Sequence, residues 1–137
     1  MGSNPGGRRE PPDTLEVRVR SLDRVRVLAT LTGAFDHHNA HRLTEALQRA
    51  LDAGAAVVLL DLSGVTFLDS TGVTRLLLAR RSARAAGGHL ALIAPSRPVE
   101  RLLSITGVDQ VLPSYPTPQA VPAAGPEPDR DSGGTAG

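Results

Sequence analysis

The stretch AAVVLLDLSGVTFLDSTG, residues 55–72, decides the fold because it predicts a buried strand that leads into the start of a helix. Its opening apolar run is too short for a helix and favours a central strand covered on both faces. The stretch closes on Asp69, Ser70 and Thr71, three residue types that cap the first turn of a helix. Gly72 follows, although only proline disfavours a helix more than glycine does. One cap would suffice, so the motif FLDSTG is a candidate functional site.

Upstream of this stretch, two strands and one helix are expected. Residues 15–20 and 25–31 each alternate between apolar and polar side chains, which is typical of half-buried strands joined as a hairpin. Val19 and Val25 are among the side chains expected to face the core. Residues 40–54 place apolar side chains at helical spacing and predict an amphipathic helix.

Strands and helices alternate in the rest of the pattern. Strand–helix–strand units require mostly parallel strands with right-handed crossovers. The sequence therefore predicts an α/β fold with a mostly parallel central sheet, a leading hairpin strand and helices packed on it. The expected elements are a strand at 55–62, a helix from the motif to Gly87, a strand at 89–94, a helix that begins near Pro98 and ends at Gly107, and a short strand at 108–112.

The two ends of the chain differ in composition from its middle. Residues 1–13 are rich in glycine, proline and arginine, and residues 113–137 hold six prolines and four glycines. Such segments bury too little apolar surface to offset the entropy lost on ordering. Both are predicted to be disordered tails, which leaves residues 14–112 as a single domain of common size.

Composition also indicates the cellular compartment in which the protein is expected to work. The 137 residues include no cysteine, so neither a disulfide framework nor thiolate chemistry is expected. No apolar run approaches the roughly 20 residues that span a membrane, and the N-terminus lacks the apolar core of a signal peptide. We expect a soluble, cytoplasmic protein that does not insert into a membrane. The net charge of +1 predicts no partner.

Enzymatic and metal-dependent functions find little support. Ser70 stands in L-x-S-x-G, not in the G-x-S-x-G of a nucleophile elbow, and no histidine is placed to act as its base. The chain has no lysine and therefore no phosphate-binding loop of the G-x-x-x-x-G-K-[ST] type. His37, His38 and His41 cluster, and the spacing of four between His37 and His41 suits a metal. No third protein ligand is recognisable beside them. We expect no enzyme, no cofactor and no metal site.

The helix after the motif carries four arginines, Arg75, Arg80, Arg81 and Arg84, with no acidic residue between them. A nucleic-acid site would need aromatic side chains for base stacking, and the chain has only two phenylalanines and one tyrosine. The arginines are typical of a solvated helix face, so no nucleic-acid partner is expected.

Three consecutive leucines on the same helix raise a separate question. Leu76, Leu77 and Leu78 spread over about 200° of the helix surface and cannot all face the core. Leu78 lies nearly opposite Leu76, on the side of Thr74 and Arg81. It is either partly buried under a neighbouring loop or an apolar contact for another protein.

Two segments resemble the STAS domain of bacterial anti-sigma factor antagonists, and most closely the sporulation branch of that family. They are LTGAFDHHNAHRLTEAL and LDLSGVTFLDSTGVTRLLLARRSARAAGGHLALIAPSRPVERLLSITGVDQVL. The resemblance covers residues 15–112. The D-S-[ST]-G motif carries it because the motif follows an apolar strand and opens a helix, as in the family. The resemblance implies the STAS fold.

It also implies a function. Family members bind a serine kinase that doubles as an anti-sigma factor, and this binding frees the sigma factor for RNA polymerase. The kinase phosphorylates the serine after the motif's aspartate, here Ser70, with Thr71 as the second choice. Phosphorylation releases the antagonist, and a metal-dependent serine/threonine phosphatase restores it.

The partner-binding residues expected from the resemblance and the helix pattern surround Ser70. They are Asp36, Asp69, Thr71, Gly72, Thr74, Arg75 and Leu78. Asp36 matches the acidic residue of the family's G-x-x-D segment. That segment departs from the family at Ala34, where glutamate is common, and at Phe35, where leucine or isoleucine is common. The absent side chain of Gly72 would let a partner approach closely, or would serve a tight strand-to-helix turn.

A phosphate on Ser70 has a physical rationale. Backbone N–H groups and the helix dipole at the start of a helix favour an anion. Two other functions stay open at this point. One is a STAS subunit of a membrane transport assembly, which docks without a phospho-switch. The other is a weak nucleotide-binding protein.

Overall fold

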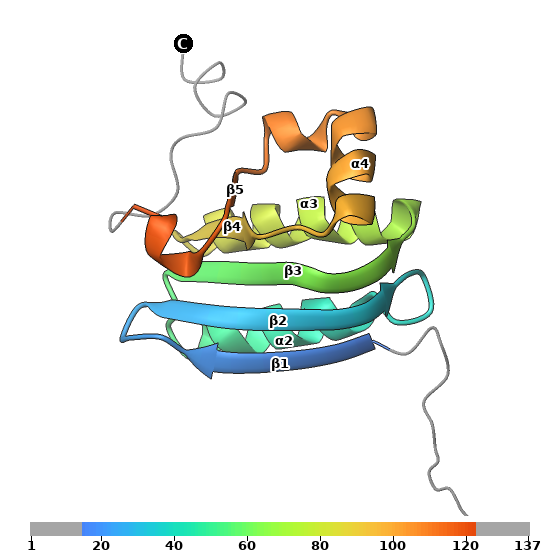
Figure 1. The fold of residues 1–137 in the computed structure, drawn as a ribbon. Coiled ribbons are helices and arrows are strands. Elements are labelled where there is room, and N and C mark those ends of the chain that lie inside the picture. Colours follow the sequence, from blue (N-terminus) through green and yellow to red (C-terminus); the bar gives the residue numbers. More distant parts are fainter. Residues whose placement is uncertain (1–14, 123–137) are drawn as a thin grey trace, which may run out of the picture.

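The computed structural model describes residues 15–122, which form one five-stranded sheet with three α-helices (Figure 1). The expected N-terminal tail at 1–13, and the part of the expected C-terminal tail (113–137) beyond residue 122, lie outside the described residues. No helix within residues 15–122 is long and apolar enough to cross a membrane. The strands are β1 (Leu15–Ser21), β2 (Arg26–Phe35), β3 (Val57–Leu68), β4 (His89–Ile93) and β5 (Ser114–Tyr115), and the helices are α2 (His41–Asp52), α3 (Ser70–Ala85) and α4 (Arg97–Thr106).

The sheet confirms the predicted α/β fold class. Its strands follow the order β1-β2-β3-β4-β5, and β1 pairs antiparallel to β2 as the leading hairpin strand. The other three pairings are parallel. β3, the apolar run of the deciding stretch, lies at the centre of the sheet. It continues to Leu68, beyond the expected end at residue 62.

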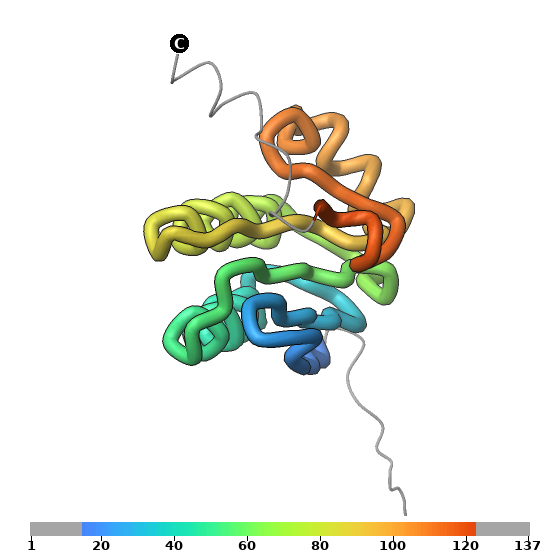
Figure 2. The backbone as a smooth tube through the Cα atoms, turned by 90° about the vertical axis from the view of Figure 1, so that its left-hand side faces the viewer, coloured from blue at the N-terminus to red at the C-terminus, as the bar shows by residue number. Residues whose placement is uncertain are grey.

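Helices α2 and α3 cover one face of the sheet, and the main core lies between them and the strands (Figure 2). The amphipathic pattern of α2 places Leu43 and Leu47 in this core. Val19 and Val25 do not join it, contrary to expectation, because each is 46% exposed. β1 is an edge strand, and Val25 lies in the hairpin turn before β2 begins.

The C-terminal part of the fold differs most from expectation. Residues 108–112 were expected to form a strand, but Val108–Gln110 is a 3-10 turn. Val108 and Leu112 are both buried, and their spacing of four suits a helical turn better than a strand. The last strand is instead β5, which pairs with β4.

The chain after β5 covers part of the second face of the sheet. Val121 is 4% exposed and packs with Leu28, Leu59 and Ala91, and Tyr115 packs against the same cluster. Residues 113–122 therefore belong to the fold, although their proline content had placed them in the C-terminal tail.

Candidate functional site

The site forms where two neighbouring strands end. β2 and β3 are parallel, and Phe35 lies beside Leu68 at their carboxyl ends. The loop that follows β2, residues 36–40, therefore lies next to the start of α3 (Figure 1). Residues more than 30 positions apart in the sequence meet at this edge of the sheet, as is usual for sites on parallel sheets.

Asp69 caps α3. Its backbone is extended, with φ −107° and ψ −177°, and its Oδ1 accepts a hydrogen bond of 2.9 Å from the N–H of Gly72. Ser70 is the first residue of the helix and is exposed. Within residues 15–122, no hydrogen bond engages the Ser70 hydroxyl. Asp69, not Ser70, is therefore the cap, and the hydroxyl of Ser70 is left accessible.

The second oxygen of Asp69 binds the loop after β2. Asp69 Oδ2 accepts from the backbone N–H of His37 at 3.1 Å and lies 3.2 Å from His37 Nδ1. Burial raises the pKa of Asp69, but the hydrogen bonds from Gly72 and His37 outweigh this effect and hold its pKa below the usual value. Because an ionised carboxylate can only accept, His37 Nδ1 must carry the proton in this contact.

Asp36 is turned into the protein. It is 7% exposed, and its Oδ1 accepts from the His38 N–H at 2.9 Å. Asn39, which is 8% exposed, accepts from the Asp36 N–H at 3.0 Å and donates to the Ala34 carbonyl at 2.9 Å. These bonds give the buried Asp36 and Asn39 side chains partners within the loop and at the end of β2. Asp36 therefore shapes the loop through these bonds, and its expected role in binding a partner stays a prediction.

Gly72 is also buried, and the structure explains why it is glycine. A Cβ at this position would lie 2.5 Å from Leu68 Cδ1 and 2.9 Å from the Phe35 carbonyl oxygen. The protein's own strand ends therefore lie close against Gly72. Of the two roles considered for Gly72, the tight strand-to-helix turn is the one that the geometry supports.

Ser70, Thr74 and Leu78 form one exposed line on α3, which we call the α3 stripe. They are four residues apart, so they lie on the same helix face. Leu78 is 42% exposed, so partial burial under a loop does not account for it. Thr71 is half-buried, and Arg75 reaches sideways to α2, where its Nη1 donates to Thr44 Oγ1 at 3.1 Å.

His37 is the site residue that sequence reasoning missed. The histidine cluster had been considered as a metal site, and within residues 15–122 no group of three or more His, Cys, Asp or Glu side chains could hold a metal. The imidazole of His37 instead contacts Asp69 and lies against the His38 ring, with centroids 4.0 Å apart. A sequence signal existed, because His37 directly follows the loop aspartate.

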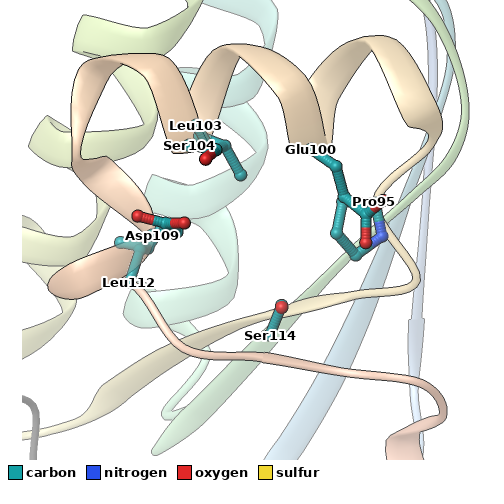
Figure 3. A pocket seen from close by; sticks show the side chains of 7 residues that line it. All are labelled: Pro95, Glu100, Leu103, Ser104, Asp109, Leu112 and Ser114. Carbon is teal, nitrogen blue, oxygen red and sulfur yellow. The ribbon is translucent and has the colours of Figure 1, made fainter.

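A separate hollow lies beside α4, and none of the expected site residues lines it (Figure 3). It encloses about 300 Å³. The carboxylates of Glu100 and Asp109 on its wall would repel the phosphates of a nucleotide. The hollow therefore gives no support to the nucleotide-binding alternative. Its lining residues are Pro95, Glu100, Leu103, Ser104, Asp109, Leu112 and Ser114.

Comparison with protein families and curated proteins agrees with this fold. The STAS domain family matches residues 16–121, which include the chain after β5. The "Anti-sigma F factor antagonist" of Paenibacillus polymyxa is 29% identical over 93 residues, which are 65% of this chain and 77% of that protein. The "Anti-sigma-B factor antagonist" of Listeria monocytogenes is 28% identical over 99 residues, which are 72% of this chain and 85% of that protein.

A solved structure is similar as well. It is that of an anti-sigma factor antagonist from Mycobacterium paratuberculosis, with 26% identity and a TM-score of 0.70. The likeness covers 80% of this chain and 92% of that one. The two curated relatives are named for different sigma factors, so their names do not select one for this chain.

The packing around Gly72 predicts the effect of adding one methyl group. We expect Gly72→Ala to destabilise the fold by about 1–3 kcal/mol, because the new Cβ must displace Leu68 or the Phe35 backbone. In an isolated helix the same change would be favourable. Urea unfolding measures the difference. Thr74→Ala, on the exposed face of α3, is the control and should change stability by less than about 0.5 kcal/mol. A Gly72→Ala protein as stable as the wild type would contradict the packing.

The lowered pKa of Asp69 predicts a pH dependence. A carboxyl whose pKa is lower in the folded state stabilises the fold above its unfolded pKa of about 3.9 and loses this effect as the pH falls. We expect Asp69→Asn to cost about 0.5–1.5 kcal/mol near pH 7. The difference in unfolding free energy between the wild type and Asp69→Asn should shrink below about pH 4.

Unfolding free energies measured between neutral and acidic pH test this expectation. Asp23 also has a lowered pKa, because the Val25 N–H and Arg26 donate hydrogen bonds to it. It is present in both proteins, so its contribution to the pH dependence cancels in the difference. If the difference in unfolding free energy stays constant or widens in acid, the hydrogen bonds of Asp69 do not lower its pKa.

Proposed function

Because this chain belongs to the STAS domain family, we propose that it is an anti-sigma factor antagonist whose partner binding is switched by phosphorylation of Ser70. The relatives from Paenibacillus and Listeria are named as antagonists of anti-sigma factors. The proposed partner is a serine kinase that also holds the sigma factor. When this chain binds the kinase, the sigma factor is released to RNA polymerase in the cytoplasm.

One observation carries the phospho-switch: Asp69 caps α3, so the Ser70 hydroxyl is exposed and unengaged at the first turn. A kinase can reach such a hydroxyl without unfolding any part of the domain. Ser70 Oγ would attack the γ-phosphorus of ATP as the bond from that phosphorus to the β,γ-bridging oxygen breaks. ADP leaves, and the hydroxyl proton passes to a base on the kinase.

The α3 stripe offers the partner a surface that responds to this modification. Leu78 supplies exposed apolar area two turns from Ser70. Phosphorylation adds about −1.5 to −2 charges, which an apolar interface would have to desolvate. A cost of only about 3 kcal/mol weakens binding by more than a hundredfold. The switch therefore requires no change in the fold.

A second enzyme completes the cycle. A serine/threonine phosphatase would hydrolyse the phosphate ester and return Ser70 to its hydroxyl form. The kinase and the phosphatase supply both chemical steps, so this chain acts as their substrate and as a regulator, not as an enzyme.

The proposal is tested by incubating the protein with ATP and each candidate anti-sigma kinase of the same genome. We expect intact mass to show the gain of one phosphate, and Ser70→Ala to abolish it. Thr71→Ala is the matched control, because it removes the neighbouring hydroxyl and should leave the modification in place.

Three other outcomes would overturn all or part of this account. Loss of the modification in Thr71→Ala but not in Ser70→Ala would show that Thr71, and not Ser70, is the phosphorylated residue. Binding without modification would leave an antagonist that acts by sequestration alone. If no kinase binds the protein, the antagonist function fails, and docking in a membrane transport assembly becomes the better account.

A further inference from the structure

The imidazole of His37 contacts Asp69, the residue that precedes Ser70. His37 Nδ1 is 3.2 Å from Asp69 Oδ2, and Ser70 is the residue that follows Asp69. The side chain of His37 is 62% exposed, whereas that of Asp69 is 23% exposed. The more exposed imidazole has room to turn in solvent, while the carboxylate stays in place as the cap of α3.

A phosphate on Ser70 and the Asp69 carboxylate would compete for the same donors. Asp69 already uses both of its oxygens, Oδ1 for the Gly72 N–H and Oδ2 for His37. The phosphate carries more charge than the carboxylate and offers three strong acceptor oxygens. Gly72 N–H is fixed within the helix, so the mobile donor is the His37 side chain.

We propose that His37 exchanges partners when Ser70 is phosphorylated: its imidazole pairs with Asp69 while Ser70 is free and with the phosphate once it is attached. His37 is then a positioning residue of the switch. This inference rests on the proposed phosphorylation of Ser70 and specifies how the site responds to it.

The exchange needs no movement of the backbone. The bond from the His37 N–H to Asp69 Oδ2, 3.1 Å long, can stay while the side chain turns away. The loop after β2 is held independently by the bonds of Asp36 and Asn39. What changes is the surface beside Ser70, where the imidazole leaves the His38 ring as well as Asp69. A partner would therefore meet an altered side-chain surface in addition to the phosphate.

The experiment uses the full chain with phosphoserine inserted at position 70 during translation, so that no kinase is needed. Imidazole ¹⁵N spectra of the unmodified and phosphorylated proteins report on His37, and the ³¹P signal reports on the phosphate. We expect the His37 nitrogen signals to shift on phosphorylation. We also expect the ³¹P signal to shift in His37→Ala but to keep its wild-type position in His41→Ala, since His41 is an exposed histidine at the start of α2.

His37→Asn is the conservative variant. Its side-chain amide can donate from near the position of Nδ1, so it should return the ³¹P signal part of the way to its wild-type position. Unchanged His37 nitrogen signals on phosphorylation, or the same ³¹P signal in wild type and His37→Ala, would overturn the exchange. Either result would leave the kinase proposal standing. Conversely, a kinase that never modifies Ser70 would remove the proposed function even if the exchange occurs in the phosphoserine protein.

Discussion

The site depends on the Asp69 carboxylate, whose two oxygens bind different parts of the chain. One oxygen caps α3 through Gly72 N–H, and the other holds the loop after β2 through His37. Because the aspartate satisfies the helix start, the hydroxyl of Ser70 is not needed for the fold and stays exposed. A side chain that the fold does not use can be modified without a cost in stability, which is what a reversible switch requires.

The packing beneath this carboxylate keeps the site in place. Gly72 allows the first turn of α3 to lie against Phe35 and Leu68, at the ends of β2 and β3. The buried bonds of Asp36 and Asn39 then fix the loop that carries His37. A rigid frame that presents the unbonded Ser70 hydroxyl and the exposed Leu78 of the α3 stripe suits a surface that a partner binds. Under the proposed phosphorylation, this frame would confine the effect of a phosphate to the side chains around Ser70.

Local patterns in the sequence predicted much of the architecture. The apolar run of β3 and the periods of the other segments led to the parallel sheet with its leading hairpin. The leucine triplet left Leu78 either partly buried or exposed to a partner, and in the structure it is exposed. Features that depend on distant contacts were missed. The bond between His37 and Asp69 joins residues 32 positions apart. The two residues of β5 are defined only by their pairing with β4, and their proline-rich surroundings carry no strand pattern.

The central claim is that phosphorylation of Ser70 weakens binding to the anti-sigma kinase. The most direct test compares the affinity of that kinase for the unmodified and the phosphorylated protein. The measurement is a calorimetric titration of the kinase with the unmodified protein and with the protein that carries phosphoserine at position 70. The account predicts that the phosphorylated form binds at least a hundredfold more weakly, which corresponds to a loss of about 3 kcal/mol. Equal affinities would contradict it, because the exposed hydroxyl of Ser70 would then have no part in the switch.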